Sequence, residues 1–202
     1  MITEKTNARR LLLRMSMKNV QKGSGSLLNL LNMQQPVISP ILQQALANLP
    51  YLLIGGLAVG YYMPIRFTQD ADIVILSDKQ ETVEEHLIAC GYRLIGLLSV
   101  GGKSYQSVNG EILDVLSSNN DYIKEAMQQP NIQNGIHVMP MPYLVLMKIM
   151  ASRVQDLADA TRMLGFANES DLQKVRDLIA RFLPDALEDI ESMIWLGKLE
   201  LE

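Results

Sequence analysis

The dipeptide Asn109-Gly110 is the feature that most limits the folds open to this chain of 202 residues. Runs of alternating apolar and polar residues lie on both sides of it, over 104–108 and 111–116. Asn-Gly between two such runs is the strongest short-range signal for a β-hairpin with a two-residue turn. The sequence therefore predicts two antiparallel strands here.

Further elements lie before and after the hairpin. Apolar runs at 51–54 and 72–76 predict two buried strands, and apolar spacings of three and four residues predict helices. The expected helices span 36–50, 57–62, 79–90, 143–164, 171–182 and 184–195. This order predicts an α+β fold, in which a mixed β-sheet is flanked by helices and followed by a C-terminal helical part.

Composition suggests three parts. The first 22 residues hold six basic residues and one acidic residue, and Gly23-Ser-Gly-Ser26 follows them. Residues 1–35 are therefore expected to form a basic arm or helix with a Gly/Ser linker, either as a solvated surface helix or as an arm that touches RNA phosphates. A core over 36–140 and a helical region over 141–202 complete the expected organisation.

Composition also excludes several classes of protein. The single cysteine allows neither an internal disulfide nor a thiolate zinc site, and two histidines far apart in sequence form no metal motif. A net charge of −4 argues against a protein whose whole surface coats nucleic acid. No apolar run reaches the roughly 18 to 20 residues of a membrane helix, and no targeting segment is recognised, so we expect a cytoplasmic protein without a membrane partner.

Asp70 and Asp72 stand two residues apart where an apolar strand is expected to begin. They are either solvated acids of a strand-entry turn or a clamp for a divalent cation such as Mg²⁺, which prefers carboxylate oxygens. Asp114 lies inside the apolar run 112–116, and ionised carboxylates are rarely buried without a partner. Three acids that converge on neighbouring strands would form the carboxylate cage of two-metal phosphoryl chemistry.

A glycine pair, Gly55-Gly56, lies between an expected strand and an expected helix. Glycines at such a place let the backbone approach a phosphate, and the helix N-terminus behind them offers free amide donors. A plain tight turn is the alternative.

Together these motifs resemble the nucleotidyltransferase superfamily of the polymerase-beta type. The motifs are the run 53–60 with its glycine pair, the run Arg66-Phe-Thr-Gln-Asp-Ala-Asp-Ile-Val74, and Asp114 farther along the chain. Gly-Gly followed by Arg-X-Thr-X-Asp-X-Asp is similar to the abortive-infection (AbiEii-like) toxins and related small bacterial nucleotidyltransferases. The resemblance covers roughly residues 50–116 and extends more weakly to about residue 165.

The resemblance implies a nucleotidyltransferase-like fold, an NTP substrate and two Mg²⁺ ions. It implies that Gly55 and Gly56 contact the triphosphate and that Asp70 and Asp72 bind metal. Asp114 would complete the metal cage and help to deprotonate the acceptor hydroxyl. The superfamily's usual second turn residue is serine, which Gly56 replaces here.

Four further residues gain roles from the same resemblance. Arg66 and Thr68 border the acid pair and would either touch phosphate or fix the loop. On the expected helix 143–164, Lys148 would neutralise the triphosphate, and Asp156 would orient the acceptor or assist as a base. An ordinary amphipathic helix is the alternative for that segment.

The implied reaction is transfer of a nucleoside monophosphate from an NTP to an acceptor hydroxyl. In the toxin-like branch, the acceptor would be RNA, such as a tRNA 3′ end, or a protein side chain, and the toxin would have a partner antitoxin. Two alternatives are a small-molecule acceptor of the aminoglycoside type and a non-catalytic nucleotide-binding or regulatory module.

Overall fold

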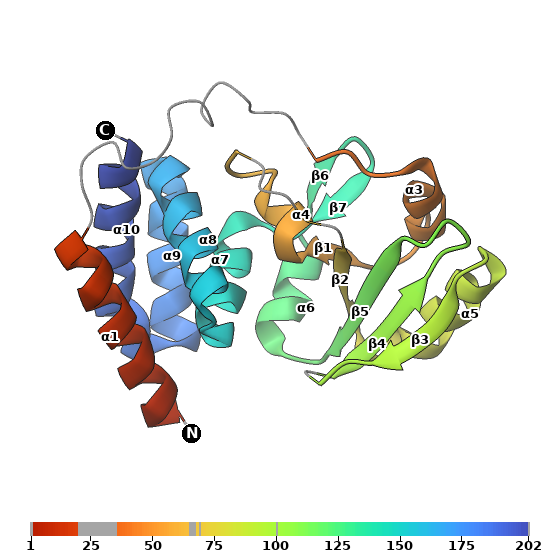
Figure 1. The fold of residues 1–202 in the computed structure, drawn as a ribbon, viewed down its shortest axis with the longest axis horizontal. Helices are drawn as coiled ribbons and strands as arrows, with labels where there is room; N and C mark the ends of the chain where they lie inside the picture. The colour runs from red at the N-terminus through yellow and green to blue at the C-terminus, as the bar shows by residue number, and fades with distance from the viewer. Residues whose placement is uncertain (1, 20–35, 65–67, 69, 100, 202) are drawn as a thin grey trace. The chain divides into compact units, whose positions relative to one another are not determined.

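The computed structural model describes residues 2–19, 36–64, 68, 70–99 and 101–201, which belong to two compact units (Figure 1). The unit that we call the sheet unit comprises residues 35–61 and 65–140, and the helical unit comprises residues 1–34, 62–64 and 141–202. The bounds of the elements in the sheet unit are α3 Pro40–Leu46, β1 Leu52–Ile54, α4 Gly55–Val59, β2 Ala71–Leu76, η1 Ser77–Lys79, α5 Gln80–Ala89, β3 Arg93–Leu97, β4 Gly102–Gln106, β5 Ile112–Ser118, α6 Asp121–Met127, β6 Asn131–Gln133 and β7 Ile136–Val138. Those in the helical unit are α1 Ile2–Asn19, α7 Met141–Ala151, α8 Val154–Phe166, α9 Glu169–Phe182, η2 Pro184–Ala186 and α10 Leu187–Leu201.

The sheet unit is built on a mixed sheet of seven strands in the order β3-β4-β5-β2-β1-β7-β6. The pairs β2/β5 and β1/β7 are parallel, and the other neighbouring pairs are antiparallel. All residues of β1 are buried, because this short apolar run lies between two neighbours near the centre of the sheet. The predicted α+β class with a mixed sheet and a C-terminal helical part is confirmed.

Helix α5 covers one face of strands β3 to β5, behind them in Figure 1. The ion pair between Lys103 of β4 and Glu84 of α5 marks the covered face. Directly paired residues of neighbouring strands share a face, so Val115, the partner of Lys103, also points toward α5 and is buried. We call the opposite face, which carries the remaining residues of these strands, the open face.

The predicted hairpin is present as β4 and β5, but the prediction of a two-residue turn is wrong. Ser107 N–H donates to the Glu111 carbonyl at 2.9 Å, and Gly110 N–H donates to the Ser107 carbonyl at 3.0 Å, so the loop has three residues. Gly110 takes a positive φ of 87°, whereas Asn109 is not among the residues with positive φ. A two-residue type I′ turn needs positive φ at both central positions, and this loop is instead of the three-residue kind with glycine last.

Strand β3 is one edge of the described sheet, and it contains a β-bulge between Leu94 and Gly96. Its residues are largely exposed, including Leu94 and Leu97. The bulge inserts Ile95 without a partner on β4, so Gly96 lies opposite Ser104.

The prediction of a single helix over 143–164 is wrong. The chain forms α7 and α8, which are separated at Ser152, a non-glycine residue with φ of 57°. This left-handed conformation ends α7, and the Ser152 hydroxyl donates to the Ile149 carbonyl at 2.5 Å. Residues eight positions apart across this break can therefore meet, which a straight helix does not allow.

Helix α1 belongs to the helical unit and packs on α10. Arg9 Nε lies 2.5 Å from Asp189 Oδ2, and both side chains are buried. A buried charge requires a partner, so this ion pair fixes the position of α1 along α10. The Gly/Ser linker at 23–26 lies outside the described residues. No described helix is long and apolar enough to cross a membrane.

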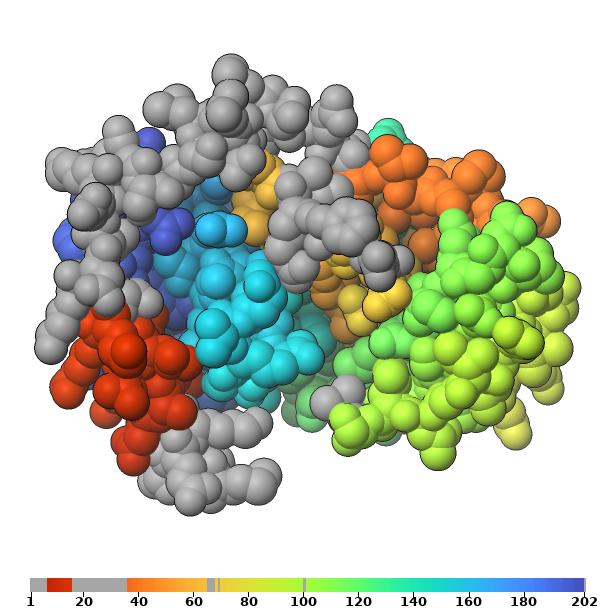
Figure 2. Space-filling view, viewed as in Figure 1, coloured from red at the N-terminus to blue at the C-terminus, as the bar shows by residue number. Residues whose placement is uncertain are grey.

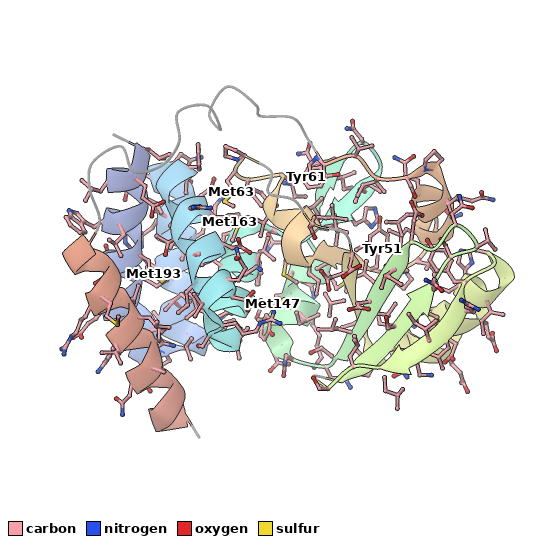
Figure 3. All side chains as sticks on the ribbon, in the orientation of Figure 1. Tyr51, Tyr61, Met63, Met147, Met163 and Met193 are labelled. Atoms are coloured by element: carbon pink, nitrogen blue, oxygen red, sulfur yellow. The ribbon has the colours of Figure 1, made fainter. Side chains whose placement is uncertain are left out.

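Helices α8 and α10 touch through their backbones. A Cβ on Gly197 would lie 2.2 Å from the Thr161 carbonyl oxygen and 2.8 Å from the Gly165 nitrogen. Met163 and Met193, labelled in Figure 3, are buried in the same unit. Only a residue without a side chain fits at position 197 with this helix spacing.

We therefore expect Gly197→Ala to lower the free energy of unfolding of the helical unit by about 1–3 kcal/mol, because the helices must separate. Urea unfolding followed by the helical circular dichroism signal measures this. The matched control is Gly96→Ala, where no described heavy atom lies within 4 Å of the new Cβ, so stability should hardly change. Equal unfolding midpoints for the two variants would contradict the backbone contact.

Candidate functional site

The glycine turn closes directly over an acidic side chain. Gly55 follows β1 and has φ of 65°, in the left-handed region. A Cβ at this position would lie 1.9 Å from Asp72 Oδ2. Glycine is required at position 55 both by its backbone angle and by the carboxylate beside it.

The strand register brings Asp72 next to Asp114. Asp72 of β2 pairs with Ile54 of β1 on one side and with Asp114 of β5 on the other. Paired residues of neighbouring strands lie about 5 Å apart and point to the same face, so both carboxylates belong to the open face beside the glycine turn.

Asp114 has an unusual environment for an acid. Its Oδ1 atom is buried and has no hydrogen-bond partner among the described residues. A buried carboxylate oxygen without a partner is costly, and the cost is removed when a cation or a proton donor binds. The Oδ1 atom of Asp114 is thus available to a ligand at this site.

Asp70 and Thr68 lie in the segment before β2. Asp70 is exposed, and its carbonyl accepts a hydrogen bond of 3.4 Å from the Thr68 hydroxyl. Arg66, also expected to border the acids, lies outside the described residues.

The acids beside the glycine turn can offer a metal ion two carboxylates. No group of three or more His, Cys, Asp or Glu side chains within the described residues is arranged to hold a metal ion. Asp72 and Asp114 nonetheless have the oxygen donors that Mg²⁺ prefers, and Mg²⁺ takes only one or two protein carboxylates in many phosphate-binding sites. The paired acids and the orphaned oxygen of Asp114 therefore fit such an ion as a two-carboxylate site.

Lys148 and Asp156 are brought together in the helical unit. Lys148 Nζ lies 2.8 Å from Asp156 Oδ1 and 2.9 Å from Asp159 Oδ2, and all three side chains are buried. The break at Ser152 permits this contact between α7 and α8. Arg153 adds a bond of 2.5 Å from its Nε to Asp156 Oδ2.

Asp159 was not among the predicted site residues, although it shares Lys148 with Asp156. The signal for it was the spacing of Asp156 and Asp159, three residues apart and thus on one helix face. Two carboxylates around one ammonium group leave a net negative charge, which the exposed Arg153 side chain compensates in part.

An aromatic pair braces the strand that leads into the glycine turn. Tyr51 stacks on His137 with ring centroids 5.6 Å apart, and the His137 N–H donates to the Tyr51 hydroxyl at 3.3 Å (Figure 3 labels Tyr51). Burial raises the pKa of Tyr51 above its usual value, so the phenol stays neutral at physiological pH. The pair therefore links the start of β1 to β7.

No family model matches the chain, and no curated protein matches it by sequence. One similar solved structure is the crystal structure of ANT(2″)-Ia in complex with adenylyl-2″-tobramycin. The likeness has a TM-score of 0.45 and 15% sequence identity, and it covers 80% of this chain and 97% of that one.

The contact between Gly55 and Asp72 gives a testable difference between two glycines. Gly110→Ala should cost about 1–2 kcal/mol of stability, because Gly110 has positive φ but no described heavy atom within 4 Å of the new Cβ. Gly55→Ala should cost about 1–3 kcal/mol more, because its methyl group also overlaps Asp72. Urea unfolding of both variants measures the difference, and equal losses would contradict the observed position of Asp72.

Lys148→Met should lower stability by about 3–5 kcal/mol, since it removes the cation that two buried carboxylates share and leaves only the exposed Arg153 beside Asp156. Lys174→Met is the control, because Lys174 pairs with Asp171 on the surface and its side chain is 63% exposed, so a change within about 1 kcal/mol is expected. Thermal and urea unfolding compare the two. If Lys148→Met were as stable as Lys174→Met, the buried cluster would not exist as described.

Proposed function

We propose that the chain is a Mg²⁺-dependent nucleotidyltransferase of the polymerase-beta type. The observation that carries this proposal is the meeting of three features on one face of the sheet. Gly55 turns over Asp72, Asp72 pairs with Asp114, and Asp114 holds an unpartnered buried oxygen. A glycine turn for phosphate beside paired carboxylates for metal suits transfer of a phosphorus group.

Each site residue has a proposed role in binding metal or phosphate. Asp72 and Asp114 hold the metal, and the exposed Asp70 is the proposed third ligand. Bound Mg²⁺ would supply positive charge to the triphosphate and to the departing pyrophosphate. The Gly55-Gly56 turn approaches the phosphates, and Thr68 and Arg66 are proposed to contact them.

The reaction is a single displacement. The acceptor hydroxyl gives its proton to the Asp114 carboxylate, and its oxygen forms a bond to the α-phosphorus of the NTP. The bond between that phosphorus and the bridging oxygen breaks, and pyrophosphate leaves with the electron pair. Products are the nucleotidylated acceptor and pyrophosphate, so all atoms are accounted for.

Lys148 is proposed to neutralise charge on the triphosphate. Asp156 is proposed to orient the acceptor. Their mutual ion pair supports a fixed geometry for both side chains. Their variants are informative in the assay below only where unfolding measurements show that the protein remains folded.

A non-catalytic nucleotide-binding module is the second candidate. The observation that favours it is the lack of a metal-holding group of three acids in the described part of the chain. A module of this kind binds NTP without transferring any part of it.

The two candidates are separated by incubating the protein with each α-labelled NTP and Mg²⁺, with tRNA, lysate protein or tobramycin as acceptor. We expect label to appear in one acceptor class, to require Mg²⁺, and to fall by about 100-fold or more in Asp72→Asn and Asp114→Asn. Asp78→Asn is the matched control, because Asp78 is an exposed acid of the same unit, next to Lys79.

Label in tRNA or protein would support the toxin-like branch, for which growth inhibition on expression and relief by an antitoxin are then tested. Label in tobramycin would support a small-molecule acceptor. NTP binding without any transfer would leave the binding module, and absence of NTP binding would remove both candidates.

A further inference from the structure

The two carboxylates that share Lys148 have different surroundings. Asp159 Oδ2 lies 2.9 Å from Lys148 Nζ, and the other oxygen, Oδ1, accepts a hydrogen bond of 2.9 Å from Gln155 Nε2. Asp156 instead gives its second oxygen to Arg153, whose side chain is 77% exposed. Helix α8 reaches the surface of the molecule, in cyan to light blue in Figure 2. Asp156 is therefore bonded to a cation at that surface, whereas Asp159 is enclosed.

The enclosure of Asp159 limits what this residue can do. Its side chain is 0% exposed, so it cannot contact a substrate. Its two oxygens are held by Lys148 and by Gln155, one from α7 and one from α8. A buried carboxylate that loses its cation is strongly destabilising, so Asp159 keeps Lys148 in one position. Any effect of Asp159 on a reaction must therefore pass through Lys148.

Lys148 retains the capacity to bind an anion in this arrangement. An ammonium group has three N–H donors, and here two of them serve Asp156 and Asp159. Among the described residues, the third donor is the one left for a phosphate oxygen. Because the side chain is already ordered by the two acids, binding a phosphate costs it little further conformational entropy.

From these contacts we infer that Asp159 is a positioning residue of the nucleotidyltransferase, which fixes Lys148 so that its third donor is held ready for the triphosphate. This inference rests on the proposed function. It adds a residue that touches no substrate, and it gives the two acids separate tasks. Asp159 holds Lys148, and Asp156 remains the residue that orients the acceptor.

Asp159→Asn tests the inference, because it keeps the size of the side chain and removes the charge that holds Lys148. Isothermal titration calorimetry with Mg²⁺ compares each NTP with its NMP, which lacks two of the three phosphates. We expect NTP affinity to fall about tenfold and NMP affinity to change less than about twofold. In the transfer assay, KM for the NTP should rise by a similar factor while kcat changes less than about threefold.

The chain offers a matched control on α9. Asp177 accepts a hydrogen bond of 2.9 Å from Gln173 Nε2, four residues earlier, as Asp159 does from Gln155, but Asp177 is exposed. Asp177→Asn should therefore change neither affinity. Asp156→Asn provides the comparison within the cluster, and it should lower kcat more than it lowers NTP affinity.

A milder substitution keeps the test decisive if Asp159→Asn does not fold. Gln155 is exposed, so Gln155→Leu removes only its bond to Asp159 and should leave the fold intact. We expect NTP affinity to fall about two- to threefold with NMP affinity unchanged, because one oxygen of Asp159 is no longer held. Gln173→Leu is the control for this variant and should change neither.

Three results would overturn the inference while the proposed function stands. They are unchanged NTP affinity in folded Asp159→Asn, equal losses of NTP and NMP affinity in that variant, and, if it does not fold, the same NTP affinity in Gln155→Leu as in Gln173→Leu. Failure of the proposed function looks different, because the unsubstituted protein would then bind no NTP. In that case the inference fails together with the function on which it rests.

Discussion

The parallel pairing of β2 with β5 is the constraint on which the candidate site depends. It sets Asp72 beside Asp114, and β1 on the other side of β2 delivers the glycine turn to the same carboxylate. Parallel neighbours require a long crossover, which here contains α5, β3 and β4. The crossover supplies the helix that covers one face of the sheet. It also supplies the two strands that widen the sheet beyond β5.

The sequence allowed the central elements to be predicted, because buried apolar runs are distinctive. The strands at 51–54 and 72–76 and the helix at 79–90 correspond to β1, β2 and α5. Strand β3 was missed because its residues are mostly exposed and lack a buried alternating pattern. The break at Ser152 was missed because a serine in the left-handed region gives no local signal comparable to glycine or proline.

The candidate site, too, could be predicted only in part from the sequence. The acids and glycines are recognisable as residue types, but their neighbours depend on one loop. A two-residue turn at Asn109-Gly110 would pair Asp114 with Tyr105, on the covered face, whereas the three-residue loop pairs it with Ser104. A shift of one residue moves a side chain to the other face of a sheet, so the pairing of Asp114 with Ser104 could not be predicted from spacing alone.

The bulge in β3 limits pairing between the edge strands of two copies of the chain. An edge strand with exposed Leu94 and Leu97 offers apolar side chains and backbone groups to any passing strand. Ile95 interrupts the regular spacing of those backbone groups, so a second strand cannot align with the whole edge. The irregularity that brings Gly96 opposite Ser104 therefore also guards the sheet against edge-to-edge aggregation.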